Sequence, residues 1–223
     1  MGTIYLVRHG QASFGAANYD QLSPLGLQQA ERLGQYWQTR QLHFDAVYTG
    51  TLQRHQQTLQ GIAQHLAALP DAQALPALNE YDGGALIRAV HADPLPPSST
   101  PDGYRQHFRV LCDALAQWMS GVITPEGMPS WMDFAGDIRQ LLDQIRQQYA
   151  QGNVLIVSSG GPISTAVAQV LGATPEAGIG LNMRLRNAAV TEFSMSPKRI
   201  MLQSFNAISH LDDPAHPEWL TYT

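Results

Sequence analysis

The segment 6–11 ends a short apolar run with an arginine and a histidine side by side, Arg8 and His9. A neutral imidazole is a nucleophile that can accept a phosphoryl group, and a neighbouring guanidinium can hold phosphate oxygens through two parallel hydrogen bonds. If the apolar run is a buried strand, His9 stands at a strand-to-loop junction, where sites in α/β proteins form. By itself Arg-His-Gly is a weak motif, and a single histidine is more often structural.

Three further polar groups follow along the chain. Arg54 begins the run Arg-His-Gln-Gln-Thr over residues 54–58, Glu80 ends an apolar stretch, and Ser159 precedes a Gly-Gly turn. Phosphoryl transfer needs an in-line nucleophile, cations on the equatorial oxygens and a proton for the leaving group. A histidine, two arginines and a protonated carboxyl group meet these needs. Taken alone, Arg54 would be a surface charge and Glu80 a solvated carboxylate, but their order along the chain favours the functional interpretation.

The elements that position these groups follow from hydrophobic periodicity. Short apolar runs predict strands at about 3–7, 45–48, 154–157, 189–195 and 200–206. Helical patterns predict helices at about 24–37, 51–69, 104–118 and 134–149. The first helix has Ser23 as its N-cap and Pro24 at its first position. The alternation predicts an α/β fold, a three-layer α/β/α sandwich with helices on both faces of a mostly parallel sheet.

The stretch from about 81 to 130 differs in character, because a proline-rich segment lies beside a single strong helical pattern. We expect one domain over residues 1–223, with this stretch as a cap-like insertion over the carboxyl edge of the sheet, where ligands bind in such folds. The alternative is a plain connection that only packs. Long ordered insertions are usually functional, which favours the cap.

The order of these motifs resembles that of the histidine phosphatase superfamily, also called the phosphoglycerate-mutase-like family. The family order is an early Arg-His-Gly, an Arg-x-x-Gln-Thr helix, an acidic residue after a third strand and a late Ser-His-Gly-Gly; the resemblance covers roughly residues 3–80 and 130–172. It implies that His9 is the nucleophile that becomes phosphohistidine. It also implies that Arg8 and Arg54 bind the phosphoryl oxygens and that Glu80 is the general acid.

Two positions depart from the family pattern. Ser159 stands where the family has its late histidine, so a hydrogen bond is kept and a possible charge is lost. The Gly-Gly turn that follows still predicts a backbone anion site, and on this interpretation Ser159→His should raise turnover. Near the Arg-His-Gly motif, Ser13 is the nearby hydroxyl and a candidate phosphate ligand. His210 is a conceivable source of the missing imidazole, although a structural role is favoured.

Composition excludes several classes of protein. The net charge is −5, from 13 basic and 18 acidic residues, which argues against nucleic acid and anionic membranes as partners. Cys112 is the single cysteine, so we expect no disulfide and no metal site, and no cofactor is implied. The chain has no apolar run of membrane-spanning length and no signal-peptide pattern, so a cytoplasmic location is expected. The sequence does not indicate an oligomeric state.

The expected activity is therefore hydrolysis of a phosphomonoester of a small phosphorylated metabolite through a phosphohistidine. The altered site makes hydrolysis a safer expectation than a mutase reaction. The alternative is a weak or inactive pseudophosphatase that binds a phosphorylated ligand or partner, for which Ser159 is the support. A serine hydrolase is excluded because its Gly-x-Ser-x-Gly elbow would need glycine where Val157 stands, and no P-loop sequence occurs.

Overall fold

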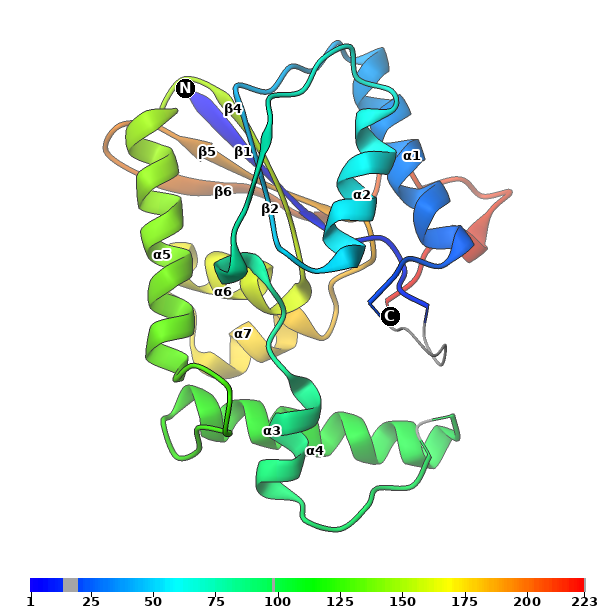
Figure 1. Cartoon of the computed structure of the whole chain (residues 1–223), viewed down its shortest axis with the longest axis vertical. Helices are drawn as coiled ribbons and strands as arrows, with labels where there is room; N and C mark the ends of the chain where they lie inside the picture. The colour runs from blue at the N-terminus through cyan, green and yellow to red at the C-terminus, as the bar shows by residue number, and fades with distance from the viewer. Residues whose placement is uncertain (14–19, 98, 223) are drawn as a thin grey trace.

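The computed structural model of the chain describes residues 1–13, 20–97 and 99–222. In this part of the chain, six strands form one sheet in the order β3-β2-β4-β1-β5-β6 (Figure 1). The strands are β1 (Gly2–Arg8), β2 (Ala46–Thr49), β3 (Ala72–Ala74), β4 (Asn153–Ser158), β5 (Val190–Met195) and β6 (Ile200–Ala207). The first four strands pair in parallel, and β5 runs antiparallel to both β1 and β6.

Seven α-helices accompany the sheet in the described residues. They are α1 (Pro24–Thr39), α2 (Gln53–Ala63), α3 (Gly83–Val90), α4 (Pro101–Met119), α5 (Trp131–Gln148), α6 (Gly160–Leu171) and α7 (Pro175–Asn182), with 3₁₀ turns at Pro76–Leu78 and Pro217–Trp219. As predicted, α1 begins after Ser23, whose hydroxyl accepts a hydrogen bond from the Gly26 N–H at 3.0 Å.

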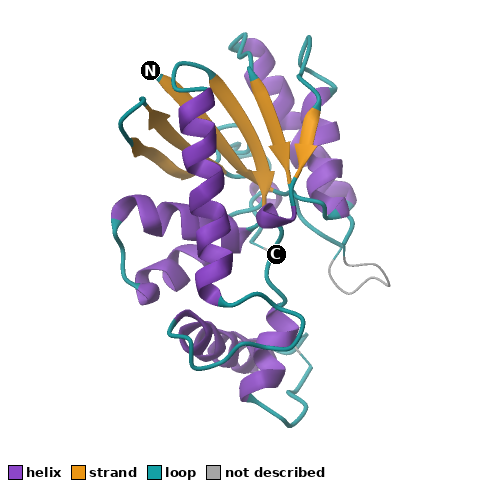
Figure 2. Cartoon of the chain, turned by 60° about the vertical axis from the view of Figure 1, so that its left-hand side comes forward, coloured by secondary structure: helices purple, strands orange, loops and turns teal. Residues whose placement is uncertain are grey.

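Alternation along the strands divides the core between the two faces of the sheet. Val7, Val47 and Leu155 pack with α1 and α2, whereas Leu6 and Ile156 pack with α5 and α6. Figure 2 shows helices on both sides of the sheet. The predicted three-layer α/β/α fold is therefore confirmed.

Some elements differ from the prediction. The helix expected to reach residue 69 ends at Ala63, because the next amides turn back to nearer carbonyls: the N–H of His65 donates to the carbonyl of Ile62. The strand β3 was not predicted, since its three residues are exposed and carry no apolar pattern. The short helices α3 and α7 were missed as well, for they span only eight residues each.

The parallel strands β1, β2 and β4 end together at one edge of the sheet. Arg8 pairs with Ser158 and Thr49 with Val157, so the residues that follow these strands meet at that edge. Figure 1 shows α3 and α4 lying beyond the same edge, and these two helices pack against each other. The predicted insertion over residues 81–130 contains these two helices, and its function as a cap stays a prediction.

Candidate active site

His9 directly follows β1 and is 4% exposed. Its Nδ1 lies 2.7 Å from the carbonyl oxygen of Gly10. Because a carbonyl only accepts, Nδ1 carries the hydrogen and Nε2 keeps a lone pair. Burial, followed by the charges of Arg8 and Arg54, holds the pKa of His9 well below its ordinary value. His9 is therefore a neutral imidazole whose Nε2 carries a lone pair.

The backbone after His9 is held by α1 and α2. The Gly10 N–H donates to Thr58 Oγ1 at 3.0 Å, and that hydroxyl donates to the carbonyl of Arg54 at 2.7 Å. A Cβ on Gly10 would lie 2.3 Å from the carbonyl oxygen of Gly26, so glycine is needed for the close approach to α1. In the structure, its small size serves the packing of the His9 loop against a helix.

The two arginines are anchored from different parts of the chain. Arg54 lies in the first turn of α2, is 7% exposed, and donates from Nη1 to Asp20 Oδ1 at 2.7 Å. Arg8 donates from Nη1 to the backbone carbonyls of Leu185 and of Tyr222, the latter at 2.8 Å. The charges of both arginines lower the pKa of His9 and that of Glu80. Arg8 and Arg54 thus lie within one charged cluster.

Glu80 follows the 3₁₀ turn Pro76–Leu78 and faces the start of α6. Its Oε1 accepts a hydrogen bond from the Gly161 N–H at 2.9 Å, and a Cβ on Gly161 would lie 2.2 Å from that oxygen. Burial raises the pKa of Glu80, while the charges of Arg8 and Arg54 act in the opposite direction. A carboxyl group with a raised pKa beside two arginines has the property that a proton donor needs.

Ser159 is fully buried at the end of β4, and its side chain does not cap α6, although it occupies the N-cap position. The usual capping donors are engaged or missing, because the Gly161 N–H donates to Glu80 and Pro162 has no N–H. The Ser159 hydroxyl instead lies 2.6 Å from Nε2 of His55.

His55 is the site residue that sequence reasoning missed. It is fully buried on α2, next to Arg54, and its ring centroid lies 5.7 Å from that of His9. The available signal was a histidine inside the Arg-x-x-Gln-Thr motif of a chain in which Ser159 stands where the resemblance predicts a late histidine. His210 packs near the ring of Tyr36, at 6.1 Å between centroids, so the imidazole at Ser159 comes from α2.

Ser13, and Arg105 of the insertion, make local contacts. The Ser13 N–H donates to the Gln21 carbonyl at 2.8 Å, and a phosphate-binding role for its hydroxyl stays a prediction. In the insertion, Arg105 pairs with Asp102 at 2.7 Å and both side chains are largely exposed.

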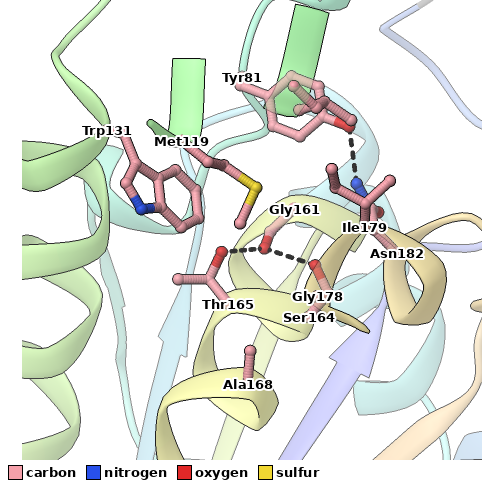
Figure 3. Close-up of a pocket in the computed structure, with 11 residues that line it drawn as sticks. Tyr81, Met119, Trp131, Gly161, Ser164, Thr165, Ala168, Gly178, Ile179 and Asn182 are labelled. Atoms are coloured by element: carbon pink, nitrogen blue, oxygen red, sulfur yellow. Dashed lines mark hydrogen bonds between the residues drawn. The ribbon is translucent and has the colours of Figure 1, made fainter. Parts of the chain in front are cut away.

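A cavity of about 20 Å³ lies beside Tyr81, lined by residues of α4, α5, α6 and α7, and holds room for roughly one water molecule. Figure 3 shows Tyr81 and Met119 on one side and Gly161 with Thr165 on the other. The Asn182 amide donates to the Tyr81 hydroxyl at 2.7 Å. Glu80 itself does not line this small space, whose volume is too small for a metabolite.

Two features of other protein classes are absent from the described residues. Within them, no group of three or more histidine, cysteine, aspartate or glutamate side chains is placed to hold a metal ion. No helix in that part of the chain is both long and apolar enough to cross a membrane.

Known proteins resemble this chain in sequence and in fold. The family model of the histidine phosphatase superfamily (branch 1) matches residues 4–208. The 2,3-bisphosphoglycerate-dependent phosphoglycerate mutase of Bartonella bacilliformis is 38% identical over 92 residues, 38% of this chain and 44% of the mutase. The match thus spans less than half the length of that relative.

Solved structures share the fold. Phosphoserine phosphatase from Entamoeba histolytica in complex with 3-phosphoglyceric acid has a TM-score of 0.68 at 23% identity, over 95% of this chain and 100% of that one. Phosphoglycerate mutase from Bacillus anthracis has a TM-score of 0.64 at 18% identity, over 93% and 94%.

Proposed function

Because the chain belongs to the histidine phosphatase superfamily, we propose that it hydrolyses the phosphomonoester of a small metabolite, with His9 carrying the phosphoryl group between two half-reactions. Membership supports a phosphoryl-transfer enzyme, since members are phosphatases or mutases. Release of the phosphoryl group to water, rather than its return to a sugar phosphate, is the part that we propose.

One observation carries this proposal: Nδ1 of His9 donates to the Gly10 carbonyl at 2.7 Å, which leaves Nε2 as the nucleophile. As Nε2 bonds to phosphorus, positive charge develops on the ring, and the Gly10 carbonyl then stabilises the Nδ1–H. The low pKa of His9 keeps the ring neutral before the attack, so no proton has to be removed first.

In the first half-reaction, Arg8 and Arg54 hold the equatorial oxygens while Nε2 of His9 attacks phosphorus. The bond to the leaving oxygen breaks, and Glu80 gives that oxygen its proton. The products are a neutral alcohol, a phosphohistidine and the Glu80 carboxylate. The hydrogen bond from the Gly161 N–H stabilises this carboxylate.

In the second half-reaction, the Glu80 carboxylate takes a proton from a water molecule whose oxygen attacks phosphorus. The N–P bond breaks, inorganic phosphate forms, and His9 and Glu80 return to their starting states. Related structures bind phosphoserine and 3-phosphoglyceric acid, which supports a small phosphorylated substrate here. We propose that the insertion over residues 81–130 selects among such substrates.

Trapping the intermediate tests the proposal. The protein is mixed with a phosphomonoester and quenched in alkali, and we expect an alkali-stable, acid-labile phosphate on the peptide that contains His9. His9→Ala should lose the label and lower turnover by more than about 10³-fold. The exposed His43 provides the control substitution, His43→Ala. Wild-type turnover in His9→Ala overturns the proposal, and phosphate binding without turnover of any ester would favour the pseudophosphatase.

A further inference from the structure

Ser159 and His55 form a buried pair beside the proposed phosphoryl site. The Ser159 hydroxyl lies 2.6 Å from Nε2 of His55, and both side chains are inaccessible to solvent. Ser159 follows β4 as His9 follows β1, and the preceding residues are register partners, so the two backbones lie side by side. The rings of His9 and His55 are 5.7 Å apart. A phosphoryl group on His9 would therefore lie next to this pair.

The backbone is shaped around the imidazole of His55. A Cβ on Gly50 would lie 2.1 Å from Nδ1 and 2.7 Å from Cε1 of that ring. Gly50 directly follows β2, in the short loop that leads to α2. Any larger residue at this position would displace the ring of His55. The position of His55 is thus determined by a glycine, by α2 and by its contact with Ser159.

The hydrogen-bonding state of His55 follows from its surroundings. Among the described residues, Nδ1 is buried and has no hydrogen-bond partner. A hydrogen on Nδ1 would be a buried unpaired donor, which is rarer in proteins than an unpaired acceptor. A hydrogen on Nε2 is satisfied by Ser159 Oγ. Burial, followed by the charge of Arg54, lowers the pKa of His55 to about 3, so the ring is neutral.

We propose that His55 and Ser159 form a hydrogen-bond relay: Nε2–H of His55 donates to Ser159 Oγ, and the Ser159 hydroxyl donates to an oxygen of the transferring phosphoryl group. This inference rests on the proposed function of His9. Ser159 is the group that touches the substrate, and His55 is a positioning residue that turns the hydroxyl hydrogen toward it. No proton is transferred. The imidazole of His55 on α2 thus acts on the phosphoryl group through the hydroxyl of Ser159.

A double-mutant cycle on turnover of an aryl phosphate tests the relay. Ser159→Ala should lower kcat by about 10²-fold, as for the loss of one preorganised donor. His55→Ala should lower kcat by about 10-fold in the wild-type background and by less than about 2-fold in the Ser159→Ala background. His65→Ala, just beyond α2, is the control for loss of an imidazole outside the site. Equal losses in both backgrounds would overturn the relay.

Two further measurements separate the relay from a packing role. His55→Gln should recover most of the loss, because its amide can donate to Ser159; if His55→Ala does not fold, His55→Leu replaces it in the cycle. In ¹⁵N NMR of the protein with inorganic phosphate, His55 should carry its hydrogen on Nε2. A hydrogen on Nδ1 in that complex would mean that Ser159 donates to His55, which contradicts the relay.

The test also distinguishes failure of the relay from failure of the proposed function. The same four proteins of the cycle are titrated with vanadate, which needs no turnover. Coupling between the two substitutions in vanadate affinity, with no ester hydrolysed by the wild type, would support the relay and overturn the phosphatase. Turnover through His9 with no coupling between the two substitutions would support the phosphatase and overturn the relay.

Discussion

Asp20 Oδ1 lies 2.7 Å from Nη1 of Arg54, and Asp20 Oδ2 accepts the Gln53 N–H at 2.9 Å. A carboxylate therefore stands at the guanidinium that we expect to bind the phosphoryl group. Repulsion between this carboxylate and a phosphate dianion weakens binding, and a factor of ten in affinity corresponds to about 1.4 kcal/mol.

Asp20→Asn should consequently bind inorganic phosphate about 3- to 10-fold more tightly, since the amide oxygen still accepts from Arg54 and the negative charge is gone. Calorimetric titration at low salt measures the change. Asp102→Asn is the matched control, because Asp102 pairs with Arg105 at the same 2.7 Å within the insertion. Weaker binding in Asp20→Asn would mean that the carboxylate orients Arg54 for phosphate.

Glu80→Gln should affect substrates according to their leaving groups. General-acid help is worth about 10²- to 10⁴-fold and matters most for poor leaving groups. We expect kcat for an alkyl phosphate to fall by about 10²-fold or more, and kcat for an activated aryl phosphate much less. Steady-state kinetics on the two substrates gives the ratio. An equal loss on both would assign Glu80 a binding or structural role.

The pH profile of kcat/KM should be bell-shaped. His9 must be neutral, and since burial lowers its pKa well below 6.5, the acidic limb should lie well below pH 6.5. Glu80 must be protonated, and since burial raises its pKa above 4.5, activity should fall as pH rises through that higher pKa. Ionisation of the substrate phosphate also affects the profile, so it is measured separately. After that contribution is removed, Glu80→Gln should show no alkaline limb. An unchanged limb would assign it to another group.

Ser159→His should now lower turnover, which reverses the expectation from sequence. The space beside Ser159 is filled by His55 at 2.6 Å, and overpacking a buried site typically costs about 1–3 kcal/mol. The double variant Ser159→His with His55→Ala makes room for the new ring and should recover activity relative to Ser159→His. Turnover and thermal midpoints of the three proteins are compared. If Ser159→His turns over faster than the wild type, the space beside His55 does not limit activity.

Sequence alone predicted much of the fold and nominated most residues of the candidate site. The apolar runs and helical periods located the central strands and the long helices, because burial on one face leaves a local pattern. His9 and Ser159 were placed at strand ends by the same reasoning. The motif order singled out Arg8, Arg54 and Glu80, and the structure brings Arg8, Arg54 and Glu80 into one electrostatic cluster with His9.

Tertiary structure decided how these residues act on one another. His55 and Ser159 are 104 residues apart, and their contact depends on the rotation of α2 against β4 and on the clearance at Gly50. Likewise, the choice of Asp20 as the partner of Arg54 depends on packing across separate segments. A local pattern records which face of an element is buried, but a hydrogen bond between distant side chains exists only once the elements have packed together.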